Sequence, residues 1–110
     1  MLPPEDGASP MDTDYILEVR VDIDPAYEEA WNRWYDEVHL PEIVQCPGFR
    51  RARRFVALEG APKYIALYDM ESERAFESAE FSNRRGWDRF KDHVKNPQVC
   101  VYKKIKEITP

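Results

Sequence analysis

A regular alternation of side chains over residues 14–23 limits the fold more than any other feature of the chain. The segment DYILEVRVDI puts five apolar residues on one face and mostly charged residues on the other, which is the pattern of a half-buried β-strand. Asp24 follows as a helix N-cap and Pro25 as the first helical residue, so a helix is expected to begin directly after the strand. The apolar face consists of Tyr15, Leu17, Val19, Val21 and Ile23.

The predicted first helix is rich in aromatic residues. Its apolar pattern is expected to stop near Pro41, because the residue before a proline disfavours helical geometry. A short turn is expected over residues 41–45. The residues that recur at helical spacing are Tyr27, Trp31, Trp34, Tyr35 and Val38.

The rest of the chain predicts three more strands and a broken helix. The dipeptide at Pro47 and Gly48 marks a turn, and the segment EGAP marks a hairpin loop. The second helical region opens at Ser72 and is expected to be interrupted at Ser82 and Asn83. Its end is expected before the dipeptide Asn-Pro at residues 96–97. The expected ranges are strands at 49–58, 63–70 and 98–108, with the broken helix over 72–94.

The order β-α-β-β-α-β predicts an α+β, ferredoxin-like fold, in which one four-stranded antiparallel sheet carries two helices on one face. We expect a single domain over residues 13–110, preceded by a loose, acidic and proline-rich tail over residues 1–12. The other sheet face mixes apolar with polar residues, which suits neither a monomer core nor a wet surface. A second copy of the sheet is the simplest cover, so we expect a homodimer. The polar residues assigned to this face are Glu18, Arg20, Arg51 or Arg54, and Tyr64 or Tyr68.

Composition argues against several classes of partner. The net charge of −5 argues against nucleic acid. No apolar run approaches the ~20 residues of a membrane span, and the N-terminus lacks the regions of a signal peptide. We therefore expect a cytoplasmic protein with no membrane partner. Cys46 and Cys100 form no metal-binding pattern and are expected to be buried free thiols.

Two segments carry a family resemblance. WYDEVHLPEI, over residues 34–43, ends an aromatic helix in a histidine followed by a proline, and CPGFRRARRF, over residues 46–55, enters a strand through Pro-Gly-Phe. With the β-α-β-β-α-β order, they resemble the dimeric α+β barrel superfamily, and within it the EthD-like and small lyase, isomerase and cyclase branches. The resemblance covers residues 14–108. It implies a fold more than an activity, because this superfamily hosts many chemistries.

Members of that superfamily include cofactor-free monooxygenases, muconolactone-type isomerases, polyketide cyclases, and haem-binding or haem-degrading proteins. The helix-terminal histidine of the family corresponds to His39. The second catalytic histidine of the polyketide cyclases has no match, since His93 lies in a different local pattern.

His39 is the central candidate for chemistry. On a helix, Asn32, Tyr35 and His39 share one stripe, and an oriented imidazole with a pKa near ~6.5 serves as a general base or acid. The alternative is a helix-terminal histidine that complements the helix dipole. We favour the catalytic role for His39, with Tyr35 or Tyr68 as the donor to a developing oxyanion or phenolate.

Aromatic rings are abundant and leucines are few, which favours a cavity even though most rings are expected in the core. The arginines over residues 50–54 alternate across a strand. One pair is expected at the substrate site or the dimer interface and the other in solvent. The predicted substrate-binding residues are Trp31, Trp34, Arg54, Phe55, Tyr64, Trp87 and Phe90.

No metal-ligand spacing, glycine-rich loop or Ser-His-Asp order is present, so we expect neither a metal nor a cofactor. The sequence favours an enzyme: a small cofactor-independent lyase, isomerase or cyclase that acts by proton transfer on a small aromatic or polyketide-like compound. Two alternatives stay open. One is a cofactor-free monooxygenase, and the other is a non-catalytic dimer that binds haem or another hydrophobic molecule.

Overall fold

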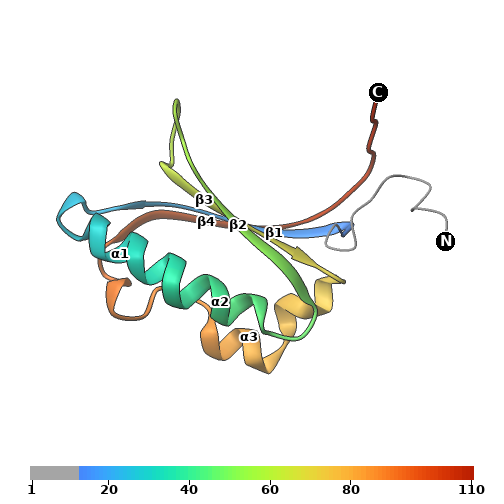
Figure 1. The fold of residues 1–110 in the computed structure, drawn as a ribbon, viewed down its shortest axis with the longest axis horizontal. Helices are drawn as coiled ribbons and strands as arrows, with labels where there is room; N and C mark the ends of the chain where they lie inside the picture. Colours follow the sequence, from blue (N-terminus) through green and yellow to red (C-terminus); the bar gives the residue numbers. More distant parts are fainter. Residues whose placement is uncertain (1–12) are drawn as a thin grey trace.

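The computed structural model describes residues 13–110, which form one four-stranded sheet with helices on one face (Figure 1). All neighbouring strands are antiparallel and stand in the order β2-β3-β1-β4, so the predicted ferredoxin-like fold is confirmed. The predicted tail over residues 1–12 lies outside the described residues. The strands are β1 (Tyr15–Ile23), β2 (Phe49–Val56), β3 (Tyr64–Met70) and β4 (Val94–Lys103).

β1 packs as its alternation predicts. It is a central strand, hydrogen-bonded to β3 on one side and to β4 on the other. Leu17, Val21 and Ile23 are buried under the helices. Glu18 and Arg20 lie on the opposite face, where they form an ion pair at 2.8 Å.

The first crossover connects β1 to β2 through one continuous helical stretch. A 3₁₀ turn, Pro25–Tyr27, leads into α1 (Glu28–Trp34), a π-helical turn (Tyr35–His39) and α2 (Leu40–Val44). The Asp24 carboxylate accepts a hydrogen bond from the Ala26 N–H at 3.0 Å, so the predicted N-cap is present.

The prediction that this helix stops near Pro41 was wrong, because the chain remains helical through it. The Leu40 N–H donates to the carbonyl of Tyr35, five residues earlier, which defines the wide π turn. A proline ring normally clashes with the carbonyl four residues before it. We infer that the widened turn before Pro41 makes room for its ring, so that the helix continues.

The second crossover, between β3 and β4, holds much less helix than predicted. It contains a 3₁₀ segment (Glu73–Glu77), the short helix α3 (Ala79–Arg84) and a 3₁₀ turn (Asp88–Phe90). The predicted interruption at residues 82–83 was wrong, since both lie inside α3. The helix does not resume after α3, because Gly86 and Asp88 take positive φ angles of 98° and 48°.

Gly48 allows the two crossovers to approach each other. Its φ angle is +86°, and a Cβ at this position would lie 2.9 Å from the Cβ of Ala75 in the second crossover. Glycine therefore suits this position for two reasons: it adopts the positive φ angle without strain, and it has no Cβ to clash with Ala75.

β4 is an edge strand that is exposed along most of its length. It runs from Val94 to Lys103, whereas a strand over residues 98–108 was predicted. Its first residues form a bulge, at which Asn96 takes a φ angle of 53° and the register against β1 shifts. The bulge and the sheet edge tolerate Pro97, which has no N–H to donate. Cys100 is exposed in this strand, so the expectation of two buried thiols was wrong for Cys100 and holds for Cys46.

The strand register shows on which face of the sheet the four residues lie that the sequence could not assign to a face. Arg54 and Tyr68 lie under the first crossover, where they contact Asp36 and Tyr35. Tyr64, on the same face, contacts Asn32. Arg51 lies on the open face and pairs with Asp69 at 2.7 Å.

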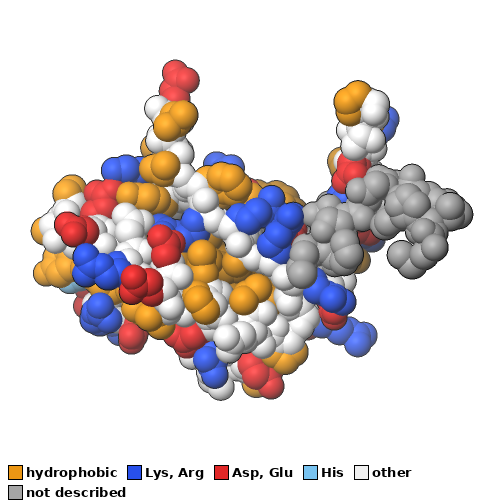
Figure 2. Space-filling view, viewed as in Figure 1, with side chains coloured by type: hydrophobic (Ala, Val, Ile, Leu, Met, Phe, Trp, Pro, Cys, Tyr) orange, Lys and Arg blue, Asp and Glu red, His pale blue; other side chains and the backbone are white. Residues whose placement is uncertain are grey.

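Two segments project from the open side of the sheet, opposite the helices: the β2–β3 hairpin and the chain after β4 (Figure 1). Each carries exposed hydrophobic side chains, with Leu58 and Ile105 both 99% exposed. Figure 2 shows hydrophobic groups on both projections. Within residues 13–110, no helix has the length and apolar character needed to cross a bilayer.

Candidate functional site

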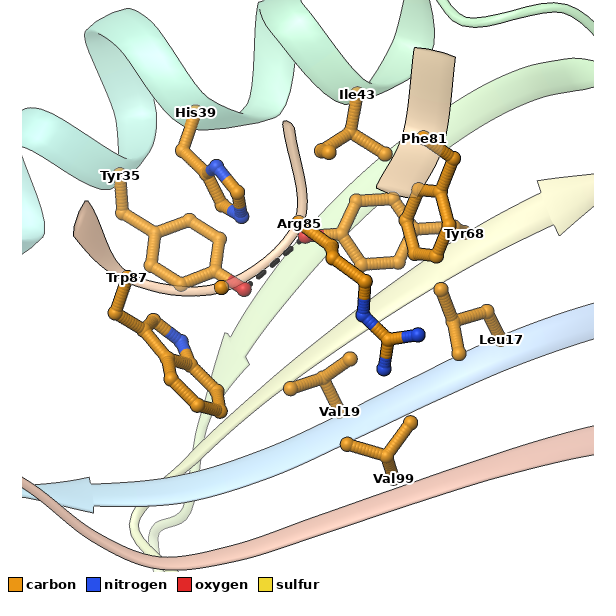
Figure 3. A pocket seen from close by; sticks show the side chains of 11 residues that line it. Leu17, Val19, Tyr35, His39, Ile43, Tyr68, Phe81, Arg85, Trp87 and Val99 are labelled. Carbon is orange, nitrogen blue, oxygen red and sulfur yellow. Dashed lines mark hydrogen bonds between the residues drawn. The ribbon is translucent and has the colours of Figure 1, made fainter. Parts of the chain in front are cut away.

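A cavity of ≈ 80 Å³ lies between the sheet and the two crossovers (Figure 3). Its wall is mainly apolar, with two phenol hydroxyls, an imidazole and a guanidinium as its polar side-chain groups, a composition typical of small-molecule sites. The lining residues are Leu17, Val19, Tyr68 and Val99 from the sheet, Tyr35, His39 and Ile43 from the first crossover, and Phe81, Arg85, Gly86 and Trp87 from the second.

A more polar outer pocket of ≈ 300 Å³ adjoins this cavity. The two share His39, Arg85 and Gly86. His39 therefore stands between an apolar chamber and a polar one, where it can face a ligand on one side and exchange protons on the other.

The His39 imidazole is held by the rings of its own helical stretch. It stacks on Trp34, with centroids 4.7 Å apart and planes at 16°, and meets Tyr35 edge-on at 4.9 Å. The side chain is buried, at 5% exposure. Burial, with a smaller contribution from the Arg54 charge, lowers the pKa of His39 from 6.5 to about 4. The imidazole is consequently neutral at pH 7 and free to accept a proton.

Tyr35 and Tyr68 join the first crossover to the sheet through their hydroxyl groups, whose oxygens lie 3.0 Å apart. Burial raises the pKa of Tyr35 and raises that of Tyr68 well above the usual value, so both phenols stay protonated near neutral pH. The nearby Trp87 side chain opposes part of this rise in the pKa of Tyr35. Either hydroxyl can be the donor; when Tyr35 donates to Tyr68, the Tyr68 hydrogen is left for a ligand oxygen.

Arg54 lies outside the cavity, behind Tyr35. Its guanidinium carbon is 4.3 Å from the centre of the Tyr35 ring and 4.9 Å from that of Trp31. It also pairs with Asp36 at 2.6 Å and donates to Asn32 at 2.7 Å. Arg54 thus adds positive potential near His39 and the phenols without touching a ligand in the cavity.

The structure brings four of the ten predicted site residues to the cavity wall: Tyr35, His39, Tyr68 and Trp87. The other six predicted side chains do not line it. Trp31, Trp34 and Phe90 are buried in the core, and Phe55 is 48% exposed on the open sheet face. Tyr64 and Arg54 lie in a shallower groove on the far side of the first crossover.

Seven lining residues were not predicted from the sequence. Leu17, Val19, Ile43, Phe81 and Val99 follow ordinary core or strand patterns, so nothing distinguishes them as site residues in one sequence. Arg85 and Gly86 had a signal that could have been used, because a glycine beside an arginine and a tryptophan breaks the helical pattern in RRGWD.

His93 lies away from the cavity and stacks on Tyr27, with centroids 3.6 Å apart. Within residues 13–110, no three His, Cys, Asp or Glu side chains are grouped closely enough to hold a metal ion.

Comparison with known proteins gives one family and a set of distant structural relatives. Residues 14–96 match the model of a family described as a domain of unknown function (DUF4286). A search of curated proteins gave no significant match.

Three solved structures illustrate the structural similarity. A dimeric ferredoxin-like protein from an uncultured marine organism has a TM-score of 0.68 and 14% identity, over 91% of this chain and 95% of that chain. The haem-degrader MhuD from Mycobacterium tuberculosis, with two haems in its active site, has a TM-score of 0.65 and 11% identity, over 86% and 99%. A candidate monooxygenase from Shewanella loihica PV-4 has a TM-score of 0.63 and 20% identity, over 84% and 95%. Identities this low support a shared fold and no shared activity.

Proposed function

The chain belongs to the DUF4286 family of domains of unknown function, and we propose that it binds a small ring compound in the cavity and removes a proton from it with His39. One observation carries the proposal. A buried, neutral imidazole and two protonated phenols converge on one apolar cavity. A base and an oxyanion donor are the two groups that proton abstraction beside a carbonyl or phenol requires.

In this mechanism, an acidic C–H or O–H proton of the bound compound moves to the free nitrogen of His39. The electron pair left behind spreads onto a substrate oxygen, which accepts a hydrogen bond from Tyr68. Burial makes the imidazolium costly on its own, but the new substrate anion lies beside it and offsets part of that cost. The outer pocket gives His39 a route by which its proton can return to solvent.

We favour monooxygenation as the outcome of this step over the lyase, isomerase or cyclase reaction expected from the sequence. Similarity to a candidate monooxygenase and to a haem-degrader supports oxygen chemistry on this fold, although only as an analogy. For a ring compound with an activated methylene group, the balance is R₂CH₂ + O₂ → R₂C=O + H₂O. The substrate carbanion supplies the electrons, one oxygen atom enters the product, and the other leaves as water.

Oxygen uptake tests this proposal. The protein is incubated with single-ring phenols and ring compounds that carry an activated methylene group, and O₂ consumption is followed beside product formation. We expect uptake that depends on the protein and falls in the His39→Ala variant. Product formed without O₂ uptake would instead favour the lyase, isomerase or cyclase reaction.

Haem binding is the second candidate, favoured by one observation: a neutral imidazole is the form of histidine that ligates iron, and His39 faces the cavity in that form. The cavity as it stands does not fit haem, because ≈ 80 Å³ is far below the ~300–1,000 Å³ of pockets for drug-sized molecules. A Soret band after haem addition that His39→Ala abolishes would support this candidate.

The open sheet face supports a homodimer of the single domain that we propose for residues 13–110. Apolar and charged residues share this face, among them Ile16, Leu67 and the Glu18–Arg20 pair. The two projecting segments stand on the same side and would flank a second copy. Similarity to a dimeric ferredoxin-like protein adds support. Light scattering should give twice the chain mass of 13.0 kDa, and a monomer at micromolar concentration would contradict the dimer.

A further inference from the structure

Arg85 brings a positive charge to the wall of the cavity. Figure 3 shows its side chain extending toward Leu17, Val19 and Val99. The guanidinium carbon lies 4.7 Å from the ring centre of Phe76 and 5.2 Å from that of Phe81, so two aromatic rings hold its position.

The guanidinium of Arg85 has no acidic partner within residues 13–110, whereas most arginines of the chain do. Its five N–H donors make no hydrogen bond there and meet no carboxylate at ion-pair distance. Among the arginines without a carboxylate partner, which include Arg74 and Arg89, Arg85 lines the cavity. The paired arginines are Arg20, Arg33, Arg50, Arg51, Arg53, Arg54 and Arg84.

The other polar groups of the cavity wall do not neutralise this charge. His39 is neutral at pH 7, and both tyrosines are protonated. In the outer pocket Glu42 pairs with Arg84 at 3.2 Å, and Asp88 lines that pocket but not the cavity. A ligand in the cavity therefore meets one unpaired guanidinium beside an apolar wall.

We propose that Arg85 binds the carboxylate of an aromatic acid whose ring occupies the cavity. A guanidinium presents parallel N–H donors that match a carboxylate, and because Arg85 is exposed, its charge is accessible to a ligand that enters the cavity. An apolar cavity of about 150 Å³ holds benzene. The cavity of ≈ 80 Å³ is smaller than this, so a single ring fits only if the wall widens, and we place that movement at the loop around Gly86. This inference rests on the proposed function, because it names the substrate class for the same cavity.

The test uses benzoate and its neutral counterpart benzamide as probes, with dissociation constants from NMR titration of the full chain. The wild-type protein should bind benzoate more tightly than benzamide. Arg85→Gln should weaken benzoate binding by about 2-fold to 5-fold, the usual worth of a solvent-exposed ion pair, and leave benzamide binding unchanged. Arg85→Lys should restore part of the preference, since it keeps the charge and loses the fork.

Arg89→Gln is the matched control, because Arg89 also stacks on an aromatic ring, at 4.4 Å from the centre of Phe90, and does not line the cavity. It should leave the binding of both probes unchanged. Equal binding of benzoate and benzamide would overturn the role of Arg85 and leave the ring-binding cavity in place. Binding of neither probe would overturn both. Benzamide binding also reports whether a variant is folded, since a misfolded Arg85→Gln protein would bind neither probe. In that case the benzoate preference of the Arg85→Lys variant tests the role of Arg85.

Discussion

The two crossovers cover the same sheet face but are built differently. The first is a continuous helical stretch of residues 25–44, and it buries Trp31, Trp34 and Tyr35. The second has a short 3₁₀ segment, the six-residue helix α3, a loop at Gly86 and a second 3₁₀ turn. The cavity forms where the two meet, because a short helix followed by a loop leaves space that a longer helix would fill.

This difference divides the site into two parts. The first crossover supplies the groups that need fixed positions, His39 and Tyr35, from a tightly packed helix. The second supplies Arg85 and Trp87 from a segment with little regular structure. Catalytic groups gain from a rigid setting, and loops are the usual place for groups that select ligands. We therefore expect mutations in the first crossover to change stability or the chemical step, and those in the second to change ligand choice.

The largest effect is expected at His39. His39→Ala should lower turnover by ~10²–10⁴-fold, the usual contribution of a general base. His93→Ala is the control, since His93 stacks on Tyr27 away from the cavity. Steady-state rates on whichever compound supports oxygen uptake would measure both. Equal rates in the two variants would contradict a catalytic role for His39 that His93 lacks.

Substitution of Trp34 and of Trp87 compares how much the packing of each crossover contributes to stability. Trp34→Ala should lower the free energy of unfolding by ~3–5 kcal/mol, because Trp34 is only 8% exposed and contacts Tyr35, His39 and Phe90. Trp87→Ala should cost about 1–2 kcal/mol, since Trp87 is only partly buried. Urea denaturation followed by circular dichroism measures both. A larger loss for Trp87 would show that the second crossover carries the stability.

The buried imidazole also predicts a pH dependence of stability. The folded pKa of His39, about 4, lies below the unfolded value of 6.5, so the unfolded chain binds the proton more readily between these values. His39 should therefore cost roughly 3 kcal/mol of stability as pH falls from 6.5 to 4. His39→Gln should remove that part of the loss in urea denaturation series at several pH values. An unchanged pH slope would mean that His39 is not buried as a neutral group.

The smallest effect concerns the hydroxyl pair that joins the first crossover to the sheet. Tyr35→Phe should cost about 1–2 kcal/mol, because it leaves the buried Tyr68 hydroxyl without its hydrogen-bond partner. Tyr27→Phe is the control, since Tyr27 is 39% exposed and lies in the turn before α1. Thermal unfolding of the two variants in parallel measures the difference in their stability.

The sequence predicted the fold well because its signals were periodic. The alternation over residues 14–23 placed β1 and its buried face, and the cap at Asp24 placed the first helix. The π turn before Pro41 was not predictable, because it depends on backbone hydrogen bonding that no residue pattern encodes. The short α3 was missed for a related reason: RGWDRFKDHV has helical composition, and the positive φ angle of Gly86 overrides it.

The site was most predictable on the side that the first helix forms. Tyr35 and His39 share a helical stripe, so their common cavity follows from spacing. Arg54 and Tyr64 were assigned to substrate binding, but the register of β2 and β3 places them behind Tyr35, and one sequence does not reveal that register. The role of Arg85 depends on its having no carboxylate at ion-pair distance within residues 13–110, which appears only in three dimensions.

The central claim is that His39 is a neutral base at the cavity wall, and the most direct test is an NMR titration of its imidazole. The chain has two histidines, so a His93→Gln variant leaves a single imidazole signal, which belongs to His39. The structure predicts that this signal stays in the neutral form as pH is lowered through 6.5 and titrates only near a pKa of about 4. A midpoint near 6.5, the value of a solvated histidine, would contradict the account, because His39 would then be neither buried nor positioned as a neutral base.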